Sequence, residues 1–238
     1  MFVDQLLRVG TFLVLLILAV SACVIFGPGL WVSYVLKKYN REPESNFPGT
    51  GGELARHLLD RYNLQDVKVV VTETGDHYSP EDRSVALTKD KFNGKTLASI
   101  VIAAHECGHA IQHANREPLF LLRHRLAQSA HSAQIVGSAL LAASPVVGGL
   151  TMMPHLSILS FSGAFLVLGY GLVVQLVTLP VELDASFKKA LPLLNTGYIS
   201  EAQLGPSKII LRAAALTYVA GTLMQILNFW RWIAVLRR

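Results

Sequence analysis

The stretch Ala103-Ala104-His105-Glu106-Cys107-Gly108-His109-Ala110 decides how the rest of this sequence is understood. At 3.6 residues per turn, His105 and His109 lie one turn apart on the same face of a helix. Two neutral imidazoles at this spacing can bind one Zn²⁺, and Glu106 is placed to accept a proton from a water that the metal activates. The H-E-x-x-H pattern therefore indicates metal-assisted hydrolysis, and it requires a third metal ligand from another part of the chain.

The composition is that of a membrane protein. Hydrophobic residues make up 52% of the 238 residues and charged residues only 16%, whereas a soluble domain has about 25% charged residues. Residues 9–35 and 126–181 contain no Asp, Glu, Lys or Arg. These observations predict a mainly α fold, a polytopic membrane helical bundle of about four spans with an inserted small α+β zincin-like section that carries the motif helix.

This interpretation divides the chain into three parts. Residues 1–37 are expected to form an N-terminal transmembrane anchor, which is too long for a cleaved signal and ends in Lys37-Lys38. Residues 38–126 form the zincin-like catalytic section. Residues 127–238 form a transmembrane bundle, with spans expected at 133–153, 156–179 and 209–229, and supply the third zinc ligand after the bundle's second helix.

The net charge of +5 does not indicate nucleic acid, because many of the basic residues flank the apolar runs. Basic residues in such places set membrane topology and contact lipid head groups. We therefore expect a lipid bilayer as a partner, no nucleic acid, and a multi-pass protein of the cell membrane whose catalytic section faces the cytoplasm. The basic tail, Arg237-Arg238, conflicts with an even number of spans.

The catalytic section has its own pattern of helices and strands. Residues 53–62 have apolar residues at helical spacing, 67–71 and 83–88 have strand patterns, and 72–80 has turn chemistry. The motif helix is expected over 96–116, ending before Pro118. Cys107 inside the motif fits a small helix-packing residue better than a metal contact.

Two carboxylates, Glu182 and Asp184, stand directly after the third apolar run. After Glu117 the only other acid is Glu201. One interpretation is a solvated helix start, with Pro180 in the first turn and acids favoured by the helix dipole. The other is the missing third ligand, because catalytic zinc keeps three protein ligands and one open position. On a helix the two acids point about 200° apart, so one would bind the metal and the other would orient a neighbour.

Four blocks of sequence resemble the YugP-like neutral zinc metallopeptidases of bacterial membranes. They are residues 76–78 (DHY), 103–112 (AAHECGHAIQ), 179–186 (LPVELDAS) and 213–220 (AAALTYVA). The resemblance covers most of the chain. It implies a membrane-bound, zinc-dependent endopeptidase with His105 and His109 as ligands and Glu106 as the general base.

A more distant similarity connects the chain with the HtpX and prenyl-protein peptidases, which carry their glutamate ligand in an E-x-x-x-D pattern. Glu182 matches that glutamate, but the fourth residue on is Ser186 instead of Asp. The similarity implies Glu182 as the metal ligand, with Asp184 as the alternative.

A residue that stabilises the oxyanion is also expected. His77 and Tyr78 are the first candidates, and Arg212 and Tyr218 compete with them. His113 continues the histidine row, but about 12 Å of helix rise separates it from His105, so the three cannot share one ion on a straight helix.

The function predicted is a membrane-embedded zinc metallopeptidase, an endopeptidase of the type with H-E-x-x-H plus Glu. It would hydrolyse peptide bonds of membrane or membrane-proximal proteins by metal-activated water. Its partners are a protein or peptide substrate and the bilayer, with a homo-oligomer left open. The alternative is a non-proteolytic membrane scaffold or partner-binding protein that retains a zinc site.

Overall fold

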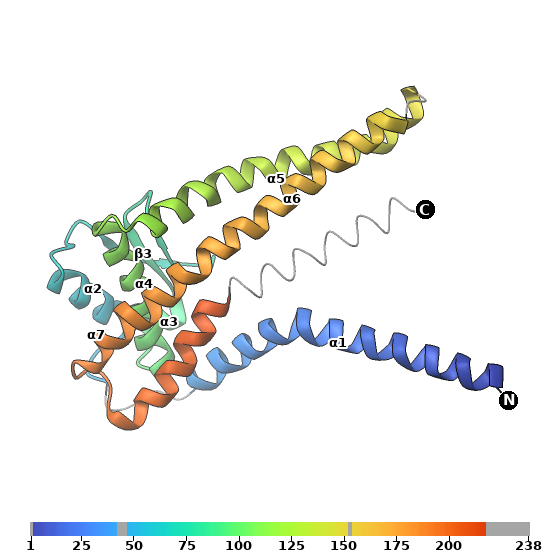
Figure 1. Cartoon of the computed structure of the whole chain (residues 1–238). Coiled ribbons are helices and arrows are strands. Elements are labelled where there is room, and N and C mark those ends of the chain that lie inside the picture. Colours follow the sequence, from blue (N-terminus) through green and yellow to red (C-terminus); the bar gives the residue numbers. More distant parts are fainter. Residues whose placement is uncertain (1, 42–46, 152–153, 218–238) are drawn as a thin grey trace.

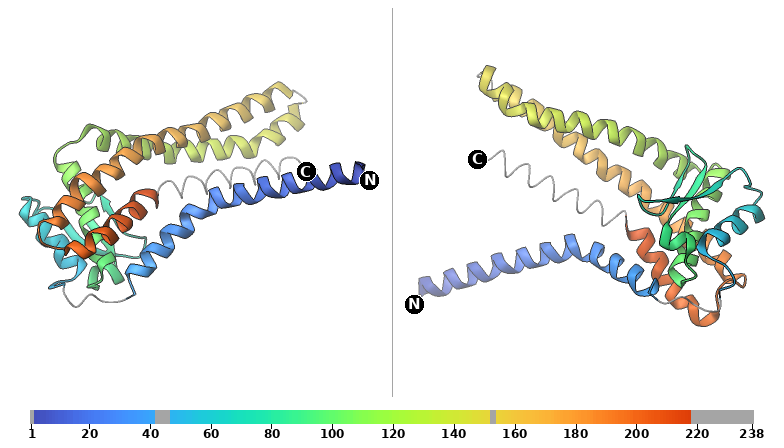
Figure 2. Two further views of the ribbon diagram at one scale, coloured as in Figure 1. Left: turned by 60° about the horizontal axis from the view of Figure 1, so that its bottom comes forward. Right: turned by 180° about the vertical axis from the view of Figure 1, so that it is seen from behind.

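The structure is a computed structural model that describes residues 2–41, 47–151 and 154–217. Helices packed on a small sheet form a head at one end of the molecule. The long helices α1 (Phe2–Tyr39), α5 (Pro118–Thr151) and α6 (Pro154–Leu183) extend from the same side of this head (Figures 1 and 2). Helices α5 and α6 run side by side as a helical hairpin.

The sheet has three strands in the order β1-β3-β2. Strand β1 (Lys68–Thr72) pairs in parallel with β3 (Ser84–Thr88), and β2 (His77–Ser79) pairs with β3 in the antiparallel sense. The strand patterns at 67–71 and 83–88 are thereby confirmed. Strand β2 lies where only a turn was expected, because a three-residue strand is too short to show alternation. Among the described residues β2 pairs with β3 alone, so its other side is a sheet edge.

The predicted helices of the head are also confirmed. Thr50 caps α2 (Gly51–Arg61) in a reciprocal capping box with Glu53. A short helix, α3 (Lys89–Asn93), leads to α4 (Leu97–Ala114), whose first turn is capped by the Thr96 side chain. Every residue of α4 from Leu97 to Gln112 is buried. An apolar helix covered on all sides is a core helix, so the H-E-x-x-H motif lies in the centre of the head.

Helix α6 does not end at Pro180, as the sequence pattern suggested. It continues to Leu183, with Pro180 inside it and exposed, and changes into a π-helix, η1 (Asp184–Ala190). The short helix α7 (Leu191–Asn195) follows, and residues 201–217 are again helical. A π-helical segment inside an α-helix is rare and often marks a functional site. Glu182 lies in the last turn of α6 before this change.

Gly108 allows η1 to lie directly against α4. A Cβ at this position would lie 2.8 Å from the Ala185 carbonyl oxygen and 3.3 Å from the Cβ of Lys189. Any larger residue would therefore separate the helix that carries the histidines from the segment that carries Glu182.

The prediction of a bundle of about four membrane spans is wrong. In the described ranges, one helical segment is long and apolar enough to cross a membrane, Ala19–Tyr39 in α1. Residues 133–151 and 156–179 instead belong to the hairpin, and one face of the C-terminal end of α6 is covered by protein, since Val174, Thr178 and Val181 are buried. The sequence pattern could not separate apolar residues that face a protein core from those that face lipid.

The fourth expected span, 209–229, is described only as far as residue 217. That part is helical and belongs to the core of the head: Ile210, Leu211, Ala213 and Ala215 are buried. Residues 218–229 lie outside the described residues. The apolar core therefore joins α4 to segments from the last third of the chain.

Candidate metal centre

Three buried side chains from two distant segments converge at the middle of α4. The Nε2 atoms of His105 and His109 lie 3.3 Å and 3.2 Å from the same oxygen, Oε2 of Glu182. All three side chains are almost fully buried, and their ligand atoms lie within 4.8 Å of one another. The structure thus brings together the three residues predicted as metal ligands.

The hydrogen bonds behind His105 fix its tautomer. Ser186 Oγ donates its one hydrogen to the Leu211 carbonyl at 3.3 Å, and it lies 3.1 Å from Nδ1 of His105. Because a hydroxyl has a single donor, Nδ1 must carry the hydrogen and donate it to Ser186. This assignment from the hydrogen-bond network leaves a lone pair on Nε2 of His105, aimed at Glu182.

The hydrogen bonds of Gln112 fix the tautomer of His109 in the same way. Its amide nitrogen donates to the Val181 carbonyl at 3.0 Å and to Oδ2 of Asp184 at 2.8 Å. Both amide hydrogens are therefore used, and Oε1 accepts from Nδ1 of His109 at 2.9 Å. The Nε2 atom of His109 also presents a lone pair to Glu182.

These tautomers leave three lone-pair donors facing one another, which is unfavourable unless a cation lies among them. The cation is either a proton on an imidazole or a metal ion. Ligand atoms at about 2.0–2.1 Å around a tetrahedral Zn²⁺ would be about 3.3 Å apart, and the distances found are 3.2 Å and 3.3 Å. Two imidazoles and one carboxylate are also a donor set that suits zinc. The residues present fit a zinc ion.

Glu182 is held from its other side by Arg123, which extends from α5. The Nη2 atom of Arg123 lies 3.2 Å from Oε1 of Glu182, as an ion pair. Burial alone would raise the pKa of Glu182, but in the metal-free protein a proton on His109 and hydrogen bonds from protonated imidazoles hold this pKa well below its usual range. The carboxylate is therefore ionised, as a metal ligand must be.

Asp184, the alternative ligand, does not point at the histidines. It contacts Gln112 and lies 3.2 Å from Nζ of Lys189. Burial opposes its ionisation, but the hydrogen bonds from Gln112 and Lys189 lower its pKa overall. Asp184 thus orients His109 through Gln112, one of the two roles considered for this acid.

Glu106 is buried next to His105 on α4. Burial raises its pKa to about 7, opposed by the charge of His105 and assisted by those of Glu182 and Asp76. A carboxylate with a pKa near neutrality can accept a proton and release it again at physiological pH. In the metal-free protein, Glu106 therefore has the pKa that a general base beside the two histidines would need.

The residues predicted to stabilise an oxyanion have other partners. His77 Nδ1 donates to the Gly75 carbonyl at 2.8 Å. The Tyr78 hydroxyl lies 2.8 Å from Nδ1 of His113, one turn beyond His109, and burial raises the pKa of Tyr78 to about 12, so it stays protonated. As neighbours on a strand, His77 and Tyr78 point to opposite faces. Of their competitors, Arg212 is exposed and Tyr218 lies outside the described residues.

Cys107 is a packing residue, as expected. It is fully buried, and its thiol donates to the Ala55 carbonyl at 3.6 Å. Burial and the neighbouring Glu106 raise its pKa, so a thiolate able to bind metal is disfavoured.

Two residues of the site were not predicted, Gln112 and Arg123. Gln112 is three residues after His109, on the same helix face, and this spacing was visible in the sequence. Arg123 stands in a run with Arg125 and His124 that resembles any basic interfacial segment, so nothing singled it out. Ser186 was noted as a departure from a carboxylate pattern, and the structure gives it the role of positioning His105.

The fold and the buried His-His-Glu cluster define the class: a helical protein with a candidate single-zinc centre on an H-E-x-x-H helix. A family model described as "Putative neutral zinc metallopeptidase" matches residues 13–237, so the chain belongs to that family of zinc peptidases. It is 33% identical over 215 residues, 88% of this chain and 92% of the relative, to "Putative membrane protease YugP" of Bacillus subtilis (strain 168). No solved structure matches the chain.

Proposed function

We propose that this family member is a membrane-anchored endopeptidase of the type with H-E-x-x-H plus Glu, acting on membrane or membrane-proximal proteins. The observation that carries the proposal is the convergence of His105, His109 and Glu182 with a buried Glu106 beside them. A bound zinc ion supplies a Lewis acid that acidifies water and polarises the scissile carbonyl.

The protein's own groups would then perform the proton transfers. Glu106 takes a proton from the attacking water and delivers it to the leaving amine, which requires a pKa near 7. Ser186 and Gln112 keep the proton of each histidine on Nδ1, so that both Nε2 atoms remain ligands. Tyr78 is proposed as the donor to the developing oxyanion, turning from His113 to do so, and His77, on the opposite face of β2, is the alternative.

Strand β2 provides a place for an extended substrate. Its open edge belongs to the strand that contains both candidate oxyanion donors, and β2 contacts the motif helix α4. A peptide that adds to this edge would gain main-chain hydrogen bonds independent of its sequence. This would suit a peptidase that cleaves many extended or unfolded chains.

Membrane attachment is proposed through α1. Its segment Ala19–Tyr39 is apolar enough to span a bilayer, and large side chains along the helix, such as Phe12, Leu15 and Leu30, are exposed. The segment ends in Lys37 and Lys38, which would place the head on the cytoplasmic side by the positive-inside rule.

The test compares wild type with Glu106→Gln, both purified in detergent and loaded with zinc. We expect cleavage of an unfolded model protein by wild type, loss of cleavage on chelation and recovery on adding zinc. Glu106→Gln should bind one zinc ion per chain and lose turnover by at least about a thousandfold. Cleavage by Glu106→Gln at the wild-type rate would exclude Glu106 as the base.

The second candidate is a scaffold that keeps a zinc site without proteolysis. The complete set of Glu106 and three ligands favours the enzyme, because a scaffold needs no buried base with a pKa of about 7. One bound zinc per chain, without cleavage of any unfolded substrate, would instead support the scaffold.

A further inference from the structure

Two arginines have an unusual backbone conformation. Among the described residues, three that are not glycine have a positive φ: Asn63 at 57°, Arg83 at 47° and Arg116 at 53°. Asparagine tolerates this left-handed region, so Asn63 after α2 is ordinary. Arginine has no such preference. Backbone conformation therefore does not explain why arginine occupies the other two positions.

The hydrogen bonds at the end of α4 show that glycine would suit the backbone at Arg116. The Arg116 N–H bonds to the His113 carbonyl, and the Glu117 N–H bonds to the Gln112 carbonyl, both at 3.0 Å. This pattern closes a helix with a left-handed residue, and glycine is the usual choice there. An arginine in this place points to a use for its side chain.

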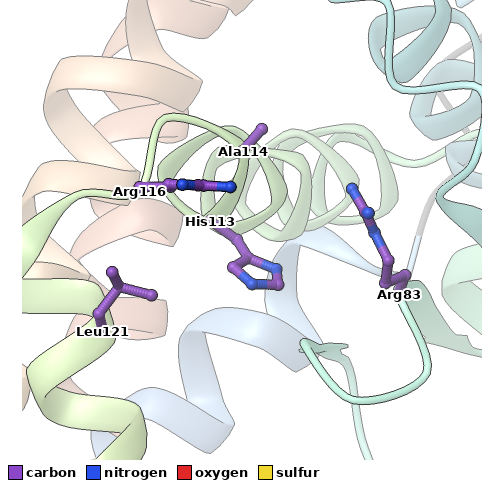
Figure 3. Close-up of a pocket in the computed structure, with 5 residues that line it drawn as sticks. All are labelled: Arg83, His113, Ala114, Arg116 and Leu121. Atoms are coloured by element: carbon purple, nitrogen blue, oxygen red, sulfur yellow. The ribbon is translucent and has the colours of Figure 1, made fainter.

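Arg83 and Arg116 line the same cavity, of about 450 Å³, together with His113, Ala114 and Leu121. Figure 3 shows His113 between Arg83 on one side and Leu121 on the other, with Arg116 at the end of the same helix. Arg83 comes from the connection between β2 and β3, so the two guanidinium groups reach the cavity from separate segments. None of these five lining residues is acidic.

The two arginines and His113 are available to a ligand. Arg83 lies 2.7 Å from Asp66, but both side chains are about half exposed, at 51% and 52%, and such pairs are weak and screened. In the part of the chain that the structure describes, no ion pair is recorded for Arg116. His113 is bonded to Tyr78 through Nδ1, which leaves its Nε2 for another partner.

The cavity lies close to the metal centre along α4. His113 is four residues, about 6 Å of helix rise, beyond His109, and an extended peptide advances about 3.3 Å per residue. Guanidinium groups bind carboxylates with matched, planar geometry. We propose that the cavity formed by Arg83, His113 and Arg116 binds a carboxylate of the peptide substrate, two or three residues from the scissile bond. This rests on the proposed peptidase function.

The first experiment measures substrate preference. Cleavage sites in an unfolded soluble protein are mapped by mass spectrometry, and peptides around one site carry Glu or Gln at each of the three positions on either side. Wild type should prefer Glu over Gln at one position, two or three residues from the bond, by about fivefold in kcat/KM. Peptides that end at this position, either as a free acid or as an amide, show whether a C-terminal carboxylate is also preferred.

Arg116→Gly is the decisive variant because glycine suits the backbone at this position. We expect it to keep or raise the thermal midpoint and to lose most of the preference for Glu, measured as the ratio of kcat/KM for the Glu and Gln peptides. Arg83→Gln should reduce the preference too. Arg61→Gln, which removes an exposed charge from α2, is the matched control and should keep it.

Equal rates for Glu and Gln peptides in wild type, or an unchanged preference in both arginine variants, would overturn the proposed cavity while leaving the peptidase function intact. If zinc-loaded wild type cleaves no peptide, the peptidase function fails instead. In that case, the binding of the same peptides, labelled and followed by fluorescence anisotropy, tests the proposed cavity independently of cleavage. Tighter binding of the Glu peptide that Arg116→Gly abolishes supports a carboxylate site, and equal binding excludes it.

Discussion

Gln112 accepts a hydrogen bond at 2.9 Å from Nδ1 of His109, three residues earlier on the same helix. Its amide nitrogen is held by Val181 and Asp184 from the segment around Glu182. One side chain therefore sets the tautomer of a histidine ligand and also fastens α4 to the segment that supplies the carboxylate ligand.

Gln112→Met should weaken zinc binding by about 10- to 100-fold, the usual effect of losing a partner behind a histidine ligand. Methionine fills a similar volume but cannot replace the amide oxygen that accepts the hydrogen bond from Nδ1 of His109. Competition with a chelator of known affinity measures the change. Gln128→Met on the exposed part of α5 is the control. Equal zinc affinity in Gln112→Met and wild type would contradict the role given to Gln112.

Glu106 should make the metal-free protein less stable at high pH. Its pKa is raised from 4.5 to about 7 in the folded state, so the folded state favours the protonated form. This contribution is complete below about pH 4.5 and is lost as pH rises through about 7, a change of about 3 kcal/mol. Urea unfolding of metal-free Glu106→Gln and wild type, between pH 5 and 8, measures it.

The difference between the two proteins isolates this carboxyl, because other titrating groups are common to both. Glu106→Gln should gain stability over wild type as pH rises towards 8. A constant difference across this range would show that Glu106 is not held in its protonated form by burial.

Gly108→Ala should destabilise the protein by about 1–3 kcal/mol, as overpacking of a tight contact does. The added methyl group would meet the Ala185 carbonyl oxygen at 2.8 Å. Moving η1 away would also move Glu182 from the histidines, so zinc affinity should fall as well. Urea unfolding and chelator competition on the same preparation measure both effects.

Gly171→Ala is the matched control for this variant. Gly171 lies inside α6, and a Cβ there meets nothing within 4 Å. Alanine should therefore stabilise the protein by about 0.5–1 kcal/mol. Similar unfolding energies for the two variants would mean that Gly108 has room that the structure does not show.

Zinc should raise the thermal midpoint of the wild-type protein, and chelation should lower it. At a free zinc concentration 1,000 times the dissociation constant, the stabilisation is about 4 kcal/mol. Glu182→Gln should lose most of this response because it removes the only ligand that does not come from α4. Scanning calorimetry with and without zinc tests both statements, and an unchanged response in Glu182→Gln would remove Glu182 from the ligand set.

The local structure of the head could be predicted because its signals are short-range. Thr50 and Thr96 mark helix starts, and the short apolar pattern of β3 marks a strand, which the structure buries over four consecutive residues. His105, His109 and Glu182 followed from ligand chemistry and a family resemblance. Arg123 could not be found, because its contact with Glu182 depends on how the hairpin packs on the head.

The membrane architecture was predicted wrongly for a related reason. An apolar run shows that a helix avoids water, but it does not tell whether lipid or protein covers it. The end of α6 is covered by protein around Glu182. The turn pattern at 72–80 concealed β2 because pairing with β3, a tertiary contact, makes that short segment a strand.

The contact between His109 and Glu182 joins residues that are 73 positions apart in the sequence. A metal ion there acts as a cross-link that closes a chain segment containing the whole α5–α6 hairpin, in the way that a disulfide closes a loop. Closing so long a loop restricts the unfolded chain by an amount comparable to a disulfide, about 4 kcal/mol. Zinc would thus belong to the folding of this protein as much as to its chemistry, and a metal-free chain would begin to open where the hairpin meets the head.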